Sequence, residues 1–312
     1  MIEYHIPVMC SQVLNNLITR KNGIYVDCTL GGGGHSREII KKIYPDGLLV
    51  ELDKDIEALE YAREKLKEYQ DKIFVIKSNF SDLGKVINDL GLKKVTGVLF
   101  DLGLSSHQIN TQSRGFSFLE SHFLDMRMNL SQQLDACYII NHYSEKELWE
   151  IFSKYGEERF SRSIARLIVQ ERKNKPIQTT KHLADIIISI YKKYKKNKWR
   201  IHPATRVFQA LRIEVNDELE RLREALKQAI HILEEQGRIC VISYHSLEDR
   251  IVKHTFKELA SKETSTLYEY RLRIISKKPF YPSENEIKEN RRARSAKMRV
   301  AEKNIFRESN QK

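Results

Sequence analysis

The first hundred residues alternate between short apolar runs and amphipathic stretches. The apolar runs, which predict strands, lie at residues 24–29, 47–53, 73–77 and 95–101. The stretches between them predict helices at residues 36–43, 56–69 and 80–90. Apolar strands separated by helices of this length are typical of βαβ units, whose parallel sheet is covered on both faces. A parallel α/β sheet is therefore expected.

A polar, helical segment then interrupts the strand pattern. Residues 110–198 contain no strand-like run, and helices are expected at residues 144–154, 158–174 and 180–193. Apolar residues then recur at spacings of three and four, which predicts one long amphipathic helix from residue 204 to residue 230.

Strands resume after this long helix. They are expected at residues 238–244, 271–275 and 296–301, the last of them antiparallel. The predicted fold is therefore a Rossmann-like, mostly parallel sheet with an inserted all-helical domain. The sheet domain is assigned to residues 1–108 and 206–312, and the insertion to residues 109–205.

The positive charge of the chain is concentrated in two segments. The 312 residues carry a net charge of +12, and a hydrophobic content of 41% excludes a disordered polycation. Residues 191–206 hold seven Lys or Arg and no acid, and residues 271–299 hold ten against three Glu. Such segments bind RNA or DNA by displacing counterions from phosphates, whereas the alternative is solvated surface charge.

Two groups of these basic residues are expected to contact RNA phosphates. If the last strand is antiparallel, the loop before it opens at the carboxyl ends of the strands, with Phe280 and Tyr281 available for stacking. The expected contacts are Lys192, Lys193, Lys195, Lys196, Arg200 and Arg206 in the first segment and Arg291, Arg292 and Arg294 in the second.

The four cysteines and the apolar runs exclude several classes of protein. Cys10, Cys28, Cys137 and Cys240 are far apart and form no CxxC pair, so neither zinc nor disulfides are expected. No apolar run approaches the ~20 residues that span a bilayer, and the N-terminus does not resemble a secretory signal. A cytoplasmic protein without a bound metal or a membrane partner is expected.

Four consecutive glycines join the first predicted strand to its helix. At residues 31–34 they allow the backbone to approach a ligand at the carboxyl ends of the strands. Asp53 ends the next strand, where a carboxylate can accept both hydroxyls of a ribose. Loop and acid together indicate adenosine binding, whereas the alternative is a purely structural tight turn.

The glycine spacing narrows the choice of cofactor. A G-x-G-x-x-G pattern requires a third glycine, but Ser36 or Arg37 stands there, and the chain contains no P-loop sequence. S-adenosylmethionine, which has no pyrophosphate, fits this loop better than a dinucleotide.

Nine motifs, in the same order along residues 5–303, resemble those of one family. They are His5-x-Pro7-Val8, Asp27-x-Thr29-x-Gly31-x-Gly33-Gly34-His35-Ser36, Phe100-Asp101-Leu102-Gly103-x-Ser105-Ser106-x-Gln108, Arg114-Gly115-Phe116-Ser117-Phe118, Leu124-Asp125-Met126-Arg127-Met128, Tyr155-Gly156-Glu157-Glu158, His202-Pro203-Ala204-Thr205-Arg206-x-Phe208-Gln209-Ala210, His245-Ser246-Leu247-Glu248-Asp249-Arg250 and Arg292-Ala293-Arg294-Ser295-Ala296. The chain resembles the bacterial ribosomal RNA small subunit methyltransferase H family, also called MraW.

The resemblance implies an activity and a set of cofactor contacts. The family transfers a methyl group from S-adenosylmethionine to N4 of a cytidine, position 1402 in the usual numbering, in the decoding centre of 16S rRNA. Its cofactor contacts correspond here to Gly33, Gly34, His35, Asp53, Phe80, Asp101 and Gln108. His107 departs from the family pattern, which often has Pro there, so the path of that loop stays open.

The catalytic residues are less well defined than the cofactor contacts. Asp101 is a candidate for orienting N4, although it could also only hold the cofactor. His245 could orient the base or a phosphate, or it could cap the helix that follows it. Asp125 and Arg127 are expected to form a structural ion pair.

Two other functions are also compatible with the sequence alone. The target could be DNA, although the loop after residue 101 lacks the motif of DNA amino-methyltransferases. The chain could also be a non-catalytic RNA-binding protein of ribosome assembly. The expected partner is 16S rRNA, in a small-subunit particle, and the oligomeric state is left open.

Overall fold

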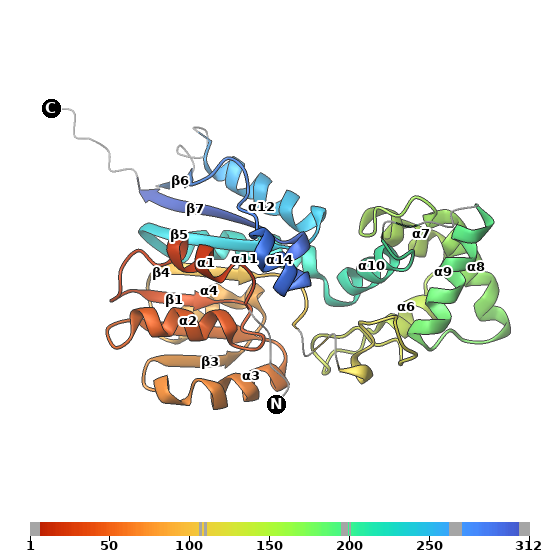
Figure 1. The fold of residues 1–312 in the computed structure, drawn as a ribbon, viewed down its shortest axis with the longest axis horizontal. Coiled ribbons are helices and arrows are strands. Elements are labelled where there is room, and N and C mark those ends of the chain that lie inside the picture. Colours follow the sequence, from red (N-terminus) through yellow and green to blue (C-terminus); the bar gives the residue numbers. More distant parts are fainter. Residues whose placement is uncertain are drawn as a thin grey trace. The chain divides into compact units, whose positions relative to one another are not determined.

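The computed structural model describes residues 7–105, 108, 111–194, 199, 201–261 and 270–305. The chain divides into two compact units, and each is described by itself. The sheet unit comprises Met1–Ser105 and Leu219–Lys312, and the helical unit comprises Ser106–Glu218 (Figure 1). Among the described residues, no helix is long and apolar enough to cross a bilayer.

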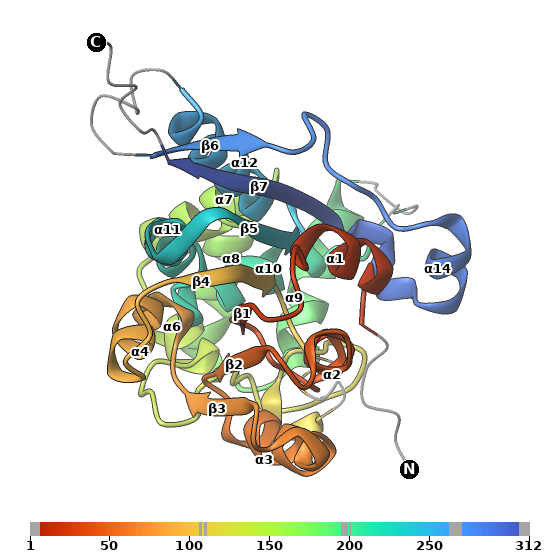
Figure 2. The ribbon, with the colours of Figure 1, turned by 90° about the vertical axis from the view of Figure 1, so that its left-hand side faces the viewer.

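The sheet unit contains a seven-stranded sheet in the order β3-β2-β1-β4-β5-β7-β6 (Figure 2). Its strands are β1 (Ile24–Asp27), β2 (Leu48–Asp53), β3 (Ile73–Lys77), β4 (Val95–Asp101), β5 (Leu233–Ser243), β6 (Tyr270–Ile274) and β7 (Lys297–Ile305). β1 to β5 are parallel, and β7 is antiparallel to both β5 and β6. The predicted fold class is confirmed, including the direction of the last strand.

The strand order places the loops after β1 and β4 at the same edge of the sheet. β1 pairs with β2 on one side and β4 on the other, so Asp27 lies opposite both Glu51 and Leu99. In open parallel sheets, ligands bind outside the carboxyl ends of the strands, where the strand order reverses. This reversal lies between β1 and β4, because β2 and β3 extend the sheet in one direction and β4 and β5 in the other.

Helices cover both faces of the sheet, and each face has its own apolar core (Figure 2). The helices of this unit are α1 (Cys10–Leu17), α2 (Gly34–Ile43), α3 (Ile56–Lys65), α4 (Leu83–Asp89), α11 (Glu218–Ile232), α12 (Ser246–Leu259) and α14 (Glu284–Glu289). α1, α2 and α3 contribute to one core, whereas α4, α11 and α12 contribute to the other. Because both faces are covered, strands such as β4 are buried from Val95 to Phe100 and do not alternate between buried and exposed residues.

The helical unit is built around a separate core. Its helices are α6 (Ala136–His142), α7 (Glu145–Lys154), α8 (Ser161–Asn174), α9 (Thr180–Lys193) and α10 (Thr205–Asn216). α7 begins with a capping box, in which Ser144 accepts from the Glu147 backbone and the Glu147 carboxylate accepts from the Ser144 N–H. All five helices contribute buried side chains to the same core.

The prediction of one long helix over residues 204–230 is wrong, because the structure has two helices there, α10 and α11. α10 ends at Asn216, Asp217 has a left-handed conformation with φ of 51°, and α11 begins at Glu218. The buried Asn216 side chain donates to the carbonyls of Met126 and Arg212, which anchors this end of α10. The apolar spacing from Val215 to Leu219 continues across the break, so the sequence pattern does not reveal it.

The helical unit also extends further than the predicted insertion. It was expected to end at residue 205, but its contacts reach Glu218. The reason is packing, because Val207, Phe208 and Leu211 of α10 are buried in the core of the helical unit. α1, α6 and α14 were not predicted from the sequence.

Candidate active site

The glycine loop after β1 is held in a conformation that favours glycine. Gly31 has φ of 50° and Gly33 has φ of 70°, and Gly33 directly precedes α2. The Gly33 N–H donates to the Leu30 carbonyl at 2.8 Å, so it closes the turn. Of the expected cofactor contacts Gly33, Gly34 and His35, only Gly34 and His35 therefore lie in the first turn of α2, where N–H groups lack helical acceptors.

Asp53 is hydrogen-bonded to the glycine loop, together with which it was expected to bind adenosine. Its Oδ2 accepts from the Gly31 N–H at 2.8 Å, and its Oδ1 accepts from the Asp55 N–H at 2.9 Å. Burial raises the pKa of Asp53, and these two backbone donors oppose the shift. The end of β2 and the glycine loop therefore form one hydrogen-bonded structure with a carboxylate at its centre.

Phe80 lies just after β3, at the same edge of the sheet as Asp53. It begins the short 3-10 helix η2 (Phe80–Asp82), which the Asn79 side chain caps by accepting from the Ser81 N–H at 3.1 Å. Its half-buried ring packs edge-on against Phe100 of β4, with ring centroids 5.9 Å apart. One aromatic ring is thus fixed at this edge with part of its surface exposed.

Asp101, the last residue of β4, is held by three different elements. Its backbone N–H donates to Thr29 Oγ1 at 2.6 Å, and its Oδ1 accepts from the Tyr244 hydroxyl at 2.7 Å. Its Oδ2 lies 3.5 Å from Nδ1 of His35. Burial, followed by the charge of Asp101, raises the pKa of Tyr244 well above its ordinary value, so Tyr244 stays a proton donor.

The His35 ring joins the glycine loop to this carboxylate. Its Nε2 lies 2.9 Å from the Val8 carbonyl, which can only accept, so Nε2 carries a proton. Nδ1 then faces Asp101, and the ring is buried. Sequence reasoning missed Thr29 and Tyr244 as partners of Asp101, although Thr29 stands within the glycine-loop motif.

Two further buried acids lie beneath the loop and were not singled out from the sequence. Asp27 accepts from the Thr29 N–H at 3.0 Å and from the Ser36 hydroxyl at 2.8 Å. Glu51, opposite Asp27 on β2, is fully buried, and neither of its carboxylate oxygens has a hydrogen-bond partner among the described residues. Burial, assisted by the charge of Asp27, raises the pKa of Glu51 well above its ordinary value.

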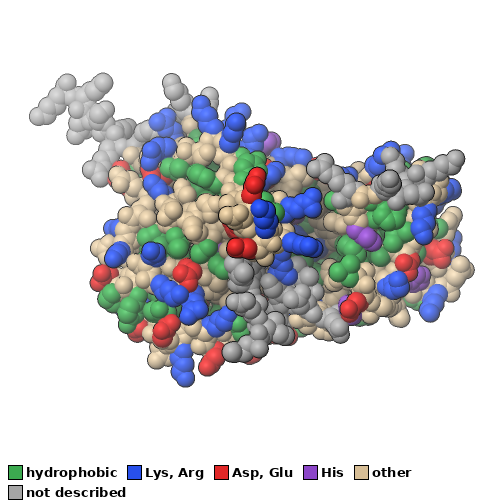
Figure 3. Space-filling view, viewed as in Figure 1, with side chains coloured by type: hydrophobic (Ala, Val, Ile, Leu, Met, Phe, Trp, Pro, Cys, Tyr) green, Lys and Arg blue, Asp and Glu red, His purple; other side chains and the backbone are tan. Residues whose placement is uncertain are grey.

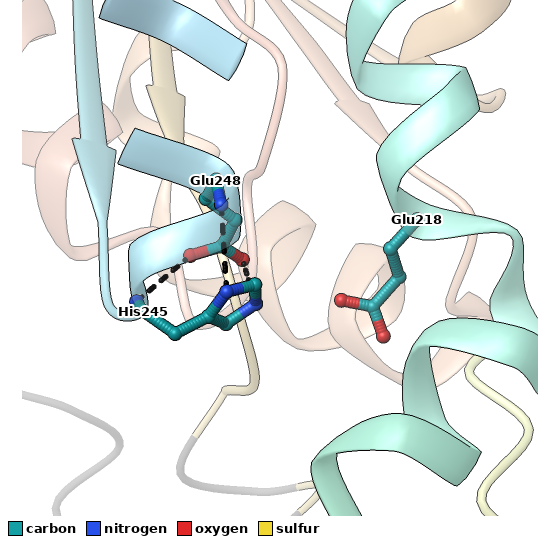
Figure 4. A group of neighbouring side chains, drawn as sticks. All are labelled: Glu218, His245 and Glu248. Atoms are coloured by element: carbon teal, nitrogen blue, oxygen red, sulfur yellow. Dashed lines mark hydrogen bonds and ion pairs between the residues drawn. The ribbon is translucent and has the colours of Figure 1, made fainter. Parts of the chain in front are cut away.

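His245 caps a helix, which is the second of its two predicted roles. It directly precedes α12, and its Nδ1 accepts from the Glu248 N–H at 3.4 Å. The Glu248 carboxylate lies 3.1 Å from Nε2 of His245 (Figure 4). The same carboxylate also accepts from the Tyr244 N–H at 2.8 Å. Any contact of this ring with a substrate stays a prediction.

The loop between β6 and β7 opens at the carboxyl edge, as expected. It contains α14 and the 3-10 helix η4 (Arg291–Ser295). Arg291 and Arg294 are exposed, whereas Arg292 is half-buried and its pKa is lowered by burial, against the opposing effect of Tyr244. Phe280 pairs with Met298 through two backbone hydrogen bonds and packs on a core, so only Tyr281 offers an open ring.

The remaining predicted residues lie in the helical unit. Lys192 and Lys193 are exposed in the last turn of α9, Arg206 donates to the Glu157 carbonyl, and Gln108 is buried. Lys195, Lys196, Arg200 and His107 lie outside the described residues. The ion pair of Asp125 with Arg127 is confirmed, with two side-chain hydrogen bonds of 2.8 Å.

The donors and acceptors of the sheet edge fit an adenosyl ligand that carries an amino-acid group. First-turn N–H groups of α2 suit a carboxylate, the Asp53 carboxylate suits ribose hydroxyls, and the Phe80 ring suits a base. The loop lies beside the segment that follows β4, because a Cβ added to Gly31 would lie 3.6 Å from the Cβ of Ser105. The described residues thus offer a partner for each part of S-adenosylmethionine.

Comparison with known proteins identifies the relatives of the chain. The model of the MraW methylase family matches residues 3–304. Proteins named ribosomal RNA small subunit methyltransferase H are 49% identical in Sulfurihydrogenibium azorense, 47% in Caldicellulosiruptor saccharolyticus and 45% in Clostridioides difficile. Each match covers 96% of this chain and 99% of the relative. The chain therefore belongs to the MraW methylase family.

Proposed function

We propose that this chain transfers the methyl group of S-adenosylmethionine to N4 of cytidine 1402 in 16S rRNA, with a small-subunit particle as substrate. Family membership and the names of the relatives support an rRNA methyltransferase. The observation that carries the proposal is Asp101, a carboxylate held by Tyr244, Thr29 and His35 beside the glycine loop.

The residues of the sheet edge divide the binding of the cofactor among them. S-adenosylmethionine, when bound, supplies an electrophilic methyl group on a positively charged sulfur. The N–H groups of Gly34 and His35 would hold its carboxylate, Asp53 would accept from the ribose hydroxyls, and Phe80 would pack on the adenine. In the helical unit, the family pattern adds Gln108 as a further contact.

Asp101 would orient the nitrogen that attacks. The lone pair of the N4 amine is delocalised into the cytosine ring, so the nitrogen must be aligned with the methyl group and pyramidalised. A carboxylate that accepts one N4 hydrogen does this. The N–C bond would form as the S–C bond breaks, which leaves S-adenosylhomocysteine, and the proton that N4 loses would pass to the Asp101 carboxylate or to solvent. The base must be unstacked from its RNA to reach this edge.

Basic residues on both units would hold the phosphates of the RNA. Arg291 and Arg294 are exposed in the loop that opens at the carboxyl edge of the sheet, and Lys192 and Lys193 are exposed at the end of α9. Arg292 is half-buried next to Tyr244, so it is better placed to act near Asp101 than on distant phosphates.

The test is transfer of labelled methyl from S-adenosylmethionine to four substrates. These are small-subunit particles that lack the modification, naked 16S rRNA, particles with uridine at position 1402, and duplex DNA. We expect N4-methylcytidine at position 1402 in the first substrate and none in the third. Methylation of DNA or of another nucleotide, or no transfer to any substrate, would overturn the proposal.

A further inference from the structure

A continuous series of ring contacts crosses the helical unit from its core to its surface. It begins at Phe208, which is 4% exposed, and continues through Phe118, with ring centroids 4.9 Å apart. Phe118 stacks on His202 at 4.5 Å, and Trp199 meets His202 edge-on at 6.5 Å. The series therefore begins in the apolar core at Phe208 and extends through Phe118 and His202 to Trp199.

The series continues from Trp199 to the ends of two neighbouring helices. Tyr191 of α9 meets Trp199 at 6.5 Å, and Phe160 meets Tyr191 at 4.9 Å. Tyr194 then stacks on Phe160 with centroids 4.6 Å apart and an interplanar angle of 11°. α8 and α9 lie side by side, so Phe160 and Tyr194 bring the start of one helix to the end of the other (Figure 1).

Two of these rings are open to solvent although their neighbours are packed. Tyr194 is 49% exposed and Trp199 is 37% exposed, and Ile201, two residues after Trp199, is 52% exposed. In the view of Figure 3, the helical unit exposes hydrophobic side chains between Lys and Arg side chains. Rings fixed on one side and open on the other are the form that base-stacking platforms take in single-strand-binding proteins.

The charge around the open rings is positive. Arg159, Lys192 and Lys193 are exposed, and the Arg159 guanidinium lies 4.8 Å from the centre of the Phe160 ring. Of the two acids of the same segment, Glu157 is exposed, whereas Glu158 is buried and accepts from the Tyr191 hydroxyl at 2.8 Å. Burial lowers the pKa of His202, so that ring is a neutral stacking partner at pH 7.

We infer that this aromatic surface, formed by Phe160, Tyr194 and Trp199, binds a single-stranded segment of the RNA by base stacking. Tyr194 and Trp199 provide the stacking faces, while Arg159, Lys192 and Lys193 contact the phosphates on either side. The inference rests on the proposed function, since it assigns a part of the same rRNA substrate to the helical unit. A basic surface without exposed rings would bind RNA by charge alone, and it would not distinguish bases from bare phosphate.

The first experiment uses the intrinsic fluorescence of Trp199. The chain has two tryptophans, so W149F leaves Trp199 as the only one while keeping an aromatic ring at position 149. We expect a twelve-residue oligocytidylate to quench this fluorescence and inorganic polyphosphate of matched charge to leave it unchanged. Equal quenching by both, or binding of the oligonucleotide without any quenching, overturns the inference, as does equal quenching by polyglutamate, which would indicate an acidic protein partner.

The second experiment compares Y194A with Y194F in the full-length chain. Loss of one stacked base weakens binding of the oligonucleotide roughly tenfold in Y194A, whereas Y194F keeps the ring and binds within about twofold of the parent. A thermal unfolding curve for each variant verifies the fold. Equal affinities of the two folded variants contradict the inference.

Methyl transfer to small-subunit particles is measured with the same preparations. If the parent chain methylates the particle while Y194A and Y194F bind RNA equally, the inference fails and the proposed function stands. If the parent transfers no methyl group but Y194A still loses affinity for the oligonucleotide, the proposed function fails and the stacking surface stands.

Discussion

The sheet unit buries polar groups at its candidate site, whereas the helical unit exposes aromatic rings. At the carboxyl edge of the sheet, polar groups are buried and bonded to one another, as in the contacts of Asp53 with Gly31 and of Asp101 with Tyr244. In the helical unit, the rings of Tyr194 and Trp199 are fixed from behind and open to solvent, with cations beside them.

This difference corresponds to two kinds of ligand. A small cofactor that is aligned for chemistry requires acceptors and donors whose positions are set before it binds. A long, flexible polyanion requires a surface that tolerates variation, which stacking and phosphate contacts provide. Changes at the sheet edge should therefore weaken cofactor binding or slow methyl transfer, whereas changes of exposed charged residues should weaken RNA binding to a smaller extent.

The largest effect is expected from Asp53→Ala. Removal of a carboxylate that accepts from ribose hydroxyls should weaken binding of S-adenosylmethionine roughly 100-fold. Calorimetry measures this affinity, and binding of RNA to the same variant should be unchanged. Asp71→Ala, at an exposed acid near the start of β3, is the matched control. Unaltered cofactor affinity in Asp53→Ala would show that Asp53 serves only the loop.

Asp101→Asn should next lower kcat on the RNA substrate. With a neutral amide in place of the carboxylate, we expect a loss of roughly 50-fold in kcat, measured at saturating cofactor. Tyr244→Phe, which removes only the hydrogen bond to Asp101, should cost about fivefold. If Asp101→Asn weakens cofactor binding but leaves kcat unchanged, Asp101 holds the cofactor and does not orient the base.

A smaller effect is expected when Arg291 and Arg294 are both changed to Ala. RNA affinity should fall about tenfold at moderate salt, and the slope of log affinity against log salt should decrease by about two, because two phosphate contacts are lost. Affinity for S-adenosylmethionine should stay the same. Arg223→Ala, at an exposed arginine of α11 that pairs with Glu220, serves as control. An unchanged salt slope would remove these two residues from the RNA contacts.

The smallest effect concerns stability and the buried Glu51. Because its pKa is raised in the folded state, folding is favoured at low pH and loses stability as pH rises above the unfolded pKa, up to the folded value. Glu51→Gln removes this loss, so we expect the variant to be more stable than the parent at pH 8 and equal to it at pH 4. Urea unfolding at both pH values measures the difference, and a difference independent of pH would contradict this account.

The predictable parts of the site are those that local sequence determines. The glycine run, Asp53 and Asp101 stand at the ends of strands whose apolar runs are continuous, and parallel strands bring their carboxyl ends to one edge. The antiparallel direction of the last strand was a supposition that the apolar pattern does not contain, and the structure has this direction. The break between α10 and α11 at Asp217 could not be predicted from the sequence, because the apolar spacing continues across it.

By itself, the sequence determined the mostly parallel sheet, the glycine loop and the family, since each depends on short motifs or on the period of apolar residues. Only the tertiary structure decided which groups meet across distant elements. Tyr244 reaches Asp101 from the end of β5, Gly33 uses its own N–H within the turn, and Phe118, Tyr191 and Trp199 belong to one series of ring contacts. Such contacts depend on packing between residues far apart in the chain, which no local pattern records.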